Sequence, residues 1–153
     1  MVKLILFLTM CASLVVWHFE TVSNPRIEVL GSGQFRFYSR ERIHSPLIYG
    51  TIQIATGFIY ITTSDNAPLL RRKFSQIDGE SLTLDYAKSK REILHILGYT
   101  AVSTQNNSVM QITYAYSGRG LSFIRSGRDR INLQISNRSG VVTVGWPVIL
   151  GSY

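Results

Sequence analysis

Residues 129–153 read DRINLQISNRSGVVTVGWPVILGSY, and this stretch predicts two neighbouring β-strands. Residues 130–136 and 141–144 are rich in β-branched and apolar side chains, which favour extended structure. Between them lies Asn137-Arg138-Ser139-Gly140, a run of residue types that is typical of turns. We therefore expect the two strands to pair with each other at the C-terminal end of the fold.

Similar strand signals recur along most of the chain. Further strands are expected over residues 26–30, 34–39, 47–54, 58–63, 99–104 and 109–116. The first two of these are expected to form a hairpin through a turn at residues 31–33. Residues 118–128 are rich in Gly and Arg and are interpreted as a connection with room for a helical turn.

Two helices are expected between these groups of strands. Apolar residues recur at helical spacing over residues 85–97, with Asp85 as the first-turn cap and Gly98 as the stop. A shorter helix is expected over residues 68–77. The order of strands, helix and strands predicts an α+β fold, in which an antiparallel sheet has one or two helices packed on one face.

Length and composition indicate one folded domain. The chain has 153 residues, of which 45% are hydrophobic and 16% charged, and this composition is typical of globular proteins. We expect residues 24–153 to form a single domain. The one cysteine, Cys11, leaves no partner for an intramolecular disulfide and excludes a metal site built on several cysteines.

Residues 1–23 are interpreted as a targeting segment. Lys3 precedes an apolar run over residues 4–17, which is shorter than the roughly 20 residues that span a bilayer. Residues 21–23 read Thr-Val-Ser and would suit cleavage after Ser23. The sequence thus predicts a signal peptide, with an uncleaved membrane anchor as the alternative. The protein is expected to be extracellular or held at the outer face of the cytoplasmic membrane.

No motif names a reaction. The sequence lacks a nucleophile elbow, a phosphate-binding loop, a dinucleotide fingerprint and a zinc-protease helix, so no catalytic residue, cofactor or metal is assigned. His95 is expected to serve the end of its helix. Asp78 and Glu80 could form a carboxylate pair, but turn or capping roles are the favoured interpretation.

The basic residues form the constellation that points to a partner. The formal net charge is +7, which favours anionic partners but also keeps a protein soluble without any partner. The candidate anion-binding residues are Arg119, Arg125, Arg128, Arg130 and Arg138. Guanidinium groups can bind phosphate through two hydrogen bonds at once. A second basic cluster lies at residues 71–73.

Three stretches carry a family resemblance. They are IDGESLTLDYAKSKREILHILGY (residues 77–99), ITYAYS (residues 112–117) and INLQISNRSGVVTVGWPVILGSY (residues 131–153). Over residues 75–153 the chain resembles the YwmB-type family, which comprises small exported proteins of Gram-positive spore formers. The resemblance implies a fold similar to that of the TATA-box-binding protein and an extracytoplasmic location, without an assigned activity. Shape alone does not carry over DNA binding.

These observations favour a non-enzymatic domain of the cell envelope. Its expected partner is a protein, an anionic polymer or a membrane surface, whereas nucleic acid is not expected because the protein is exported. Two alternatives stay open from the sequence. One is a small exported enzyme whose residues cannot be assigned, and the other is a pilin-like subunit of a surface assembly.

Overall fold

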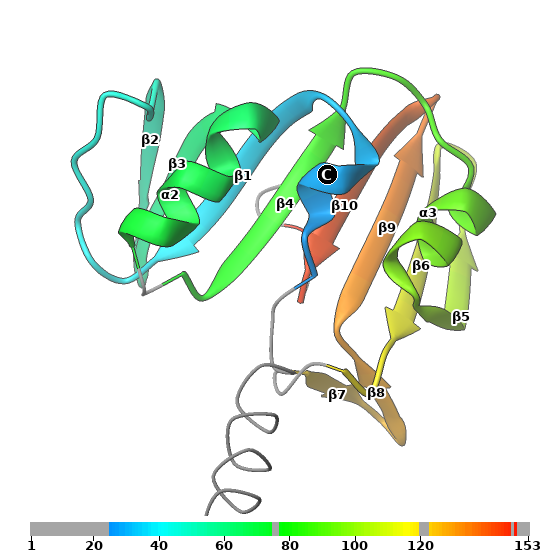
Figure 1. The fold of residues 1–153 in the computed structure, drawn as a ribbon. Coiled ribbons are helices and arrows are strands. Elements are labelled where there is room, and N and C mark those ends of the chain that lie inside the picture. The colour runs from blue at the N-terminus through cyan, green and yellow to red at the C-terminus, as the bar shows by residue number, and fades with distance from the viewer. Residues whose placement is uncertain (1–24, 75–76, 120–122, 148, 150–153) are drawn as a thin grey trace, which may run out of the picture.

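The computed structural model describes residues 25–74, 77–119, 123–147 and 149 (Figure 1). Eight strands form one antiparallel sheet in the order β2-β3-β1-β4-β10-β9-β6-β5. Their bounds are Gly33–Ser39 (β1), Gly50–Ile54 (β2), Gly57–Thr63 (β3), Gly79–Leu84 (β4), Thr100–Asn106 (β5), Met110–Tyr116 (β6), Leu133–Arg138 (β9) and Val141–Trp146 (β10). Strands β7 (Ile124–Ser126) and β8 (Asp129–Ile131) form a separate hairpin.

The helical part of the described chain is small. The two α-helices are α2 (Ala67–Lys73) and α3 (Lys90–Leu97), and two short 3-10 helices are η1 (Ile27–Leu30) and η2 (Ser64–Asn66). The expectation of an α+β fold on an antiparallel sheet is confirmed, and the sheet dominates it. The expected C-terminal hairpin is present in part as β9–β10, in which residues 134–138 pair with residues 141–145. Residues 130 and 131 belong instead to β8 and pair with β7, and the strand extends through Asn137 and Arg138, which were expected to lie in the turn.

Alternation along the strands separates two faces of the sheet. Phe35 of β1 lies opposite Leu82 of β4, and Leu82 lies opposite Val144 of β10. All three side chains are buried in one apolar cluster, which also contains Leu70 of α2 and Ile93 of α3. Successive side chains of a strand point to opposite faces of the sheet. The residues on either side of these three along each strand therefore point away from this core.

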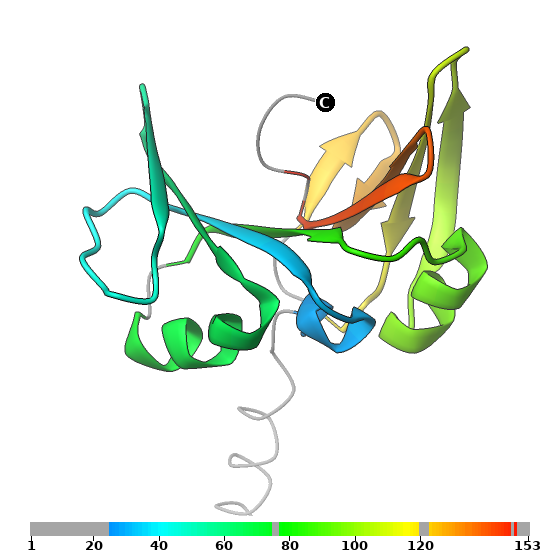
Figure 2. The same cartoon turned by 90° about the horizontal axis from the view of Figure 1, so that it is seen from above.

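The sheet is strongly curved. In Figure 2 the outer pairs β2–β3 and β5–β6 turn away from the central strands toward the same side, so that one face of the sheet is concave. The chain leaves the end of β10 on this concave side (Figure 2). The central strands β4 and β10 form its floor and join the two halves of the sheet.

Four local expectations differ from the structure. Residues 27–30 form the 3-10 helix η1, and β1 pairs instead with β3 and β4. Residues 79–84 form a central strand that the sequence did not predict. Helix α3 begins after Ser89, whose Oγ accepts a hydrogen bond from the backbone N–H of Glu92, so the expected cap at Asp85 is wrong. Residues 118–128 contribute β7 to a hairpin.

The expected targeting segment, residues 1–23, lies outside the described residues, so its interpretation stays a prediction. None of the helices that the structure describes is long and apolar enough to cross a bilayer.

The expected stop of the main helix is present, because Gly98 follows α3 in the left-handed conformation with φ 71°.

Candidate functional site

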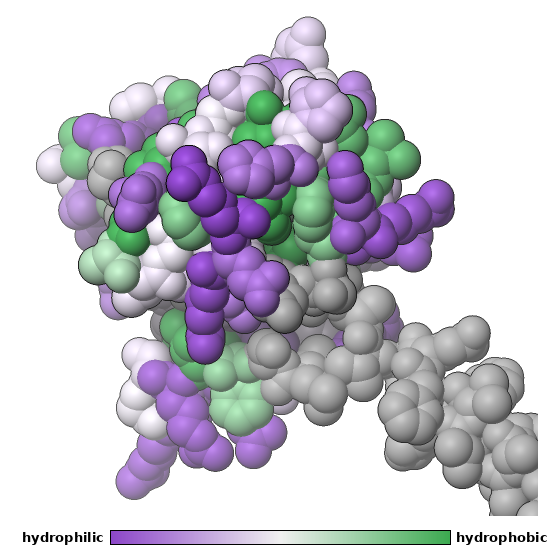
Figure 3. Space-filling view, turned by 90° about the vertical axis from the view of Figure 1, so that its left-hand side faces the viewer, coloured by the Kyte–Doolittle hydropathy of each residue, from purple (hydrophilic) through white to green (hydrophobic). Residues whose placement is uncertain are grey.

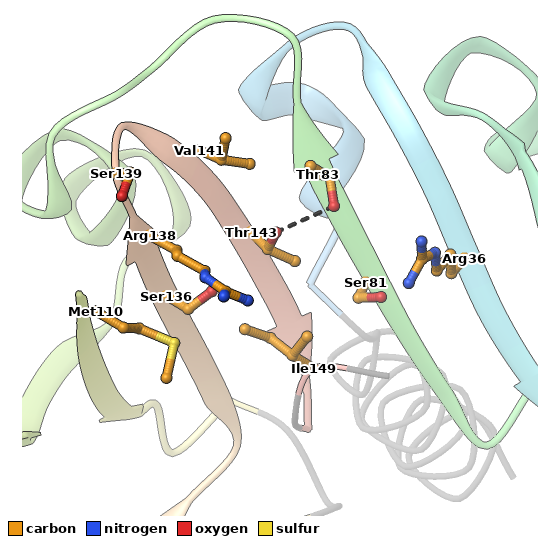
Figure 4. Close-up of a pocket in the computed structure, with 10 residues that line it drawn as sticks. All are labelled: Arg36, Ser81, Thr83, Met110, Ser136, Arg138, Ser139, Val141, Thr143 and Ile149. Atoms are coloured by element: carbon orange, nitrogen blue, oxygen red, sulfur yellow. Dashed lines mark hydrogen bonds between the residues drawn. The ribbon is translucent and has the colours of Figure 1, made fainter. Parts of the chain in front are cut away.

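A pocket with a cavity volume of about 380 Å³ lies on the concave face of the sheet (Figure 4). Its lining comes from strands β1, β4, β6, β9 and β10, from the β9–β10 turn and from the chain after β10. The lining residues are Arg36, Ser81, Thr83, Met110, Ser136, Arg138, Ser139, Val141, Thr143 and Ile149. Among them are two arginines and five hydroxyl side chains, and none is acidic.

Hydroxyl side chains cross the floor of the pocket in register. Thr83 of β4 lies opposite Thr143 of β10, which in turn lies opposite Ser136 of β9. The Oγ1 atoms of Thr83 and Thr143 are 3.0 Å apart, within hydrogen-bond distance, and this bond is drawn in Figure 4. A hydroxyl group both donates and accepts, so this row can also donate to the oxygen atoms of a ligand.

The two arginines enter the pocket from opposite sides. Figure 4 shows the side chain of Arg36 pointing inward from β1, while that of Arg138 points inward from the end of β9. Arg36 donates from Nε and Nη2 to Oε1 of Gln34, at 3.1 and 2.8 Å. This neutral amide orients the guanidinium group without cancelling its charge. Neither arginine forms an ion pair with another residue in the described part of the chain.

The chain after β10 forms one wall of the pocket. The backbone N–H of Ile149 donates to Oε1 of Gln134, at 3.1 Å. Gln134 belongs to β9 and lies opposite Gly145 of β10. This bond holds Ile149 against the sheet, where its side chain adds an apolar surface beside the hydroxyl row (Figure 4).

The structure divides the five arginines that the sequence singled out. Arg138 lines the pocket, whereas Arg125, Arg128 and Arg130 belong to the β7–β8 hairpin and its turn. Arg119 lies elsewhere, at the C-terminal end of α3. A Cβ atom added to Gly98 would lie 3.2 Å from Nη1 of Arg119. A cation is favoured at this end of a helix, so the position of Arg119 beside α3 is electrostatically favourable.

The expected carboxylate pair does not form. Asp78 binds Arg40, with 3.4 Å between Oδ2 and Nε, while Glu80 is fully buried and binds Arg71. Burial raises the pKa of Glu80, and the bonds from Arg71 oppose that rise. Burial lowers the pKa of Arg71, but its interactions with Glu80 and Glu28 outweigh this and raise it. The charge of Arg71 is therefore paired inside the protein, and only Arg72 and Lys73 of the predicted basic cluster at residues 71–73 are exposed.

Sequence reasoning missed most of the pocket. Residues 34–39 are predicted to form a strand. The alternation in QFRFYS already places Arg36 on the face of this strand opposite to that of Phe35 and Phe37. Ser81 and Thr83 were missed because residues 79–84 were not expected to be a strand. The alternation of Leu82 and Leu84 with Ser81 and Thr83 was the available signal.

Comparisons with protein-family models, with curated proteins and with solved structures all find no match to this chain. The chemistry of the pocket therefore has to be read from its own residues. Its lining contains no histidine, cysteine or carboxylate, and the described residues contain no group of acidic, histidine or cysteine side chains that could hold a metal ion. Two guanidinium groups and a row of hydroxyls suit the binding of an anion rich in oxygen atoms.

Proposed function

We propose that this protein is a non-enzymatic domain of the cell envelope that binds a phosphate-bearing anionic polymer in the concave-face pocket. The observation that carries the proposal is the pair Arg36 and Arg138. Both guanidinium groups point into a pocket with no acidic lining residue, and neither is neutralised by a described carboxylate. Charge-assisted hydrogen bonds from arginine to phosphate are among the strong ones in proteins.

The separation of the two arginines favours an extended ligand. Arg36 lies on β1 and Arg138 on β9, three strand steps away, or about 14 Å at the usual spacing of about 4.8 Å. Register also places Arg36 level with Gln134, four residues before Arg138 on the same strand. A chain with several anionic groups can meet both arginines and the hydroxyls between them better than one small ion can.

The proposal takes the concave face to be the open one and the helices to cover the other. Leu70 of α2 and Ile93 of α3 share a buried cluster with Phe35. Arg36 and Ser81 point away from that cluster by alternation along their strands. On this arrangement a polymer can approach the pocket without displacing a helix.

Export is part of the proposal and rests on the sequence. The short apolar run over residues 4–17 supports a signal peptide or an anchor at the outer face of the membrane. The resemblance to the YwmB-type family supports the same location and assigns no activity. An anionic envelope polymer is a partner that an exported basic protein would meet, with a protein partner as the alternative outcome of the test.

Binding of synthetic poly(glycerol phosphate) to the full chain tests the ligand class. We expect binding that weakens steeply with added salt, because cations that neutralise phosphates release counterions. The double variant Arg36→Gln/Arg138→Gln should bind at least tenfold more weakly. The matched control Arg72→Gln/Arg91→Gln removes two exposed arginines elsewhere and should change binding by less than about threefold.

Either of two results would contradict the proposal. One is equal weakening in the pocket variant and in the control, which would mean that only net charge matters. The other is a lack of any affinity for the polymer at 50 mM salt. If the pocket variant binds a protein partner as well as the wild type does, the binding function belongs to another surface.

A further inference from the structure

The β7–β8 hairpin is a basic lobe outside the main sheet. In Figure 1 it projects beyond the lower end of β9, and Figure 3 shows it as a separate lobe below the body, with hydrophilic side chains around hydrophobic ones. Residues 124–130 are all exposed, and Ile131 is buried at its base. A segment this exposed contributes little to the core, so packing places few limits on its side chains.

One face of the hairpin carries a preformed pair of cations. Arg125 of β7 lies directly opposite Arg130 of β8. Their guanidinium carbons lie 5.8 and 5.0 Å from the centre of the Phe123 ring. Like charges opposite each other across a strand pair are destabilising, and the aromatic ring offsets part of this repulsion. An anion bound between the two arginines would remove the repulsion.

The acidic residue of the hairpin lies on its other face. Asp129 is opposite Ser126, one position along from the arginine pair, so its side chain points away from Arg125 and Arg130. Asp129 forms no ion pair with any described residue. With Arg128 in the turn, the lobe therefore presents three arginines against one carboxylate, and the arginine face contains no acid.

The base of the lobe is attached to the main sheet by hydrogen bonds and a ring contact. Buried Asn132 accepts a hydrogen bond from the backbone N–H of Ser117 at Oδ1 and donates from Nδ2 to the carbonyl oxygen of Ser117, both at 2.9 Å. The ring of Tyr116 meets the ring of Phe123 edge-on, with 6.3 Å between ring centres. These contacts fix the direction of the lobe before any partner arrives.

We propose that the β7–β8 hairpin docks onto a bilayer surface that contains anionic phospholipids. Arginines near such a surface are attracted by its negative potential. The Phe123 ring is already occupied by Tyr116 and by the two guanidinium groups, which leaves it poorly placed to stack on a nucleic acid base. This docking surface is distinct from the pocket and does not depend on the ligand of the pocket.

Flotation of the full chain with vesicles tests the proposal. The vesicles are phosphatidylcholine alone, or phosphatidylcholine with 30% phosphatidylglycerol, at 0.1 M salt. We expect Arg125→Gln/Arg130→Gln to lower the partition coefficient for the anionic vesicles roughly 30-fold, as the loss of two surface cations at about 1 kcal/mol each implies. Its partition into neutral vesicles, which reports any contribution of the apolar N-terminal run, should not change.

Control variants separate this surface from net charge and from the pocket. Arg72→Gln/Arg91→Gln and Arg36→Gln/Arg138→Gln each remove two arginines and should keep the partition within about threefold of the wild type. Arg125→Lys/Arg130→Lys should retain most of the binding, because a lipid surface attracts charge without requiring paired hydrogen bonds. A failure of polymer binding by the pocket variant would leave this result unchanged.

Several outcomes would overturn the proposal. Equal binding of the wild type to neutral and anionic vesicles would do so, as would equal losses in the hairpin variant and the two controls. Release of the protein from vesicles by 10 mM inorganic phosphate, at constant ionic strength, would indicate a site for free phosphate. Binding of a single-stranded oligonucleotide that needs Arg125 and Arg130, without vesicle binding, would assign the lobe to nucleic acid.

Discussion

Arg71 and Glu80 form a bidentate ion pair inside the protein, with Nε 2.6 Å from Oε1 and Nη2 2.5 Å from Oε2. Glu28 binds the third nitrogen of the same guanidinium group, at 2.5 Å from Nη1. The guanidinium group also lies over the ring of Phe35, 5.4 Å from its centre. Through these contacts α2 and η1 are connected to the central strand β4.

Replacement of Arg71 by methionine should destabilise the fold strongly. The change leaves the buried Glu80 without its partner, and removal of one member of a buried pair typically costs about 3–5 kcal/mol. Urea unfolding followed by circular dichroism measures the loss. The same change at the exposed neighbour Arg72 should cost less than about 0.5 kcal/mol. Similar losses for the two variants would show that the pair contributes little.

Gly33 permits the close approach of β1 to β4. A Cβ atom at this position would lie 2.0 Å from the backbone oxygen of Thr83, so Gly33→Ala must displace one of the two strands. We expect a loss of about 1–3 kcal/mol in the free energy of unfolding, the usual range for overpacking. Gly118→Ala is the matched control, since a Cβ there meets no atom within 4 Å. A thermal melt of both variants decides the prediction, and equal midpoints would refute it.

Asn132 should matter both for stability and for the direction of the β7–β8 lobe. Asn132→Ala leaves the buried N–H and carbonyl groups of Ser117 unpaired, at a cost of about 2–4 kcal/mol. Asn137→Ala removes one exposed turn bond to Gly140 and should cost about 1 kcal/mol or less. Urea unfolding compares the two. If Asn132→Ala proves as mild as the control, the side chain does not hold the lobe.

We expect the protein to lose folding stability at alkaline pH because of Tyr99. Burial raises the pKa of Tyr99 from 10.0 to about 12. The folded state therefore holds this proton more tightly than the unfolded chain does, and the contribution to stability is complete below pH 10 and lost as the pH rises toward 12. Tyr99→Phe should lose less stability than the wild type between pH 9.5 and 12 in urea unfolding.

The exposed Tyr86 provides the control for this pH dependence, because it is 81% exposed. Tyr86→Phe should follow the wild type across the same pH range. If Tyr99→Phe and Tyr86→Phe lose stability in parallel, another group is responsible for the alkaline transition.

Thr143 should contribute to ligand binding in the concave-face pocket. Thr143→Val keeps the shape of the side chain and removes the hydroxyl group beside Thr83. Loss of one hydrogen bond of about 1 kcal/mol corresponds to roughly fivefold weaker binding of poly(glycerol phosphate). Thr104→Val, on the edge strand β5, removes a similar hydroxyl pair outside the pocket and should leave binding unchanged. Equal affinities for both variants would exclude the hydroxyl row from the site.

Local sequence patterns predicted the elements whose signals lie within a few residues. Alternation identified β1, β3, β6 and the β9–β10 hairpin, and Gly98 correctly ended the main helix. The prediction missed β4, although residues 81–84 alternate, because its buried run also contains a carboxylate. Glu80 is tolerated there because Arg71 reaches it from another element, and local propensity contains no information about such a partner.

The sequence by itself determined that the chain is basic, mostly β, and alternates polar and apolar residues along its strands. Only the tertiary structure decided that β4 pairs with β10, which brings Arg36 and Arg138 to one pocket from positions about a hundred residues apart. It also separated the hairpin arginines from Arg138. Alternation arises from each strand's own backbone geometry, whereas strand order depends on packing and hydrogen bonds between distant segments, which no local pattern encodes.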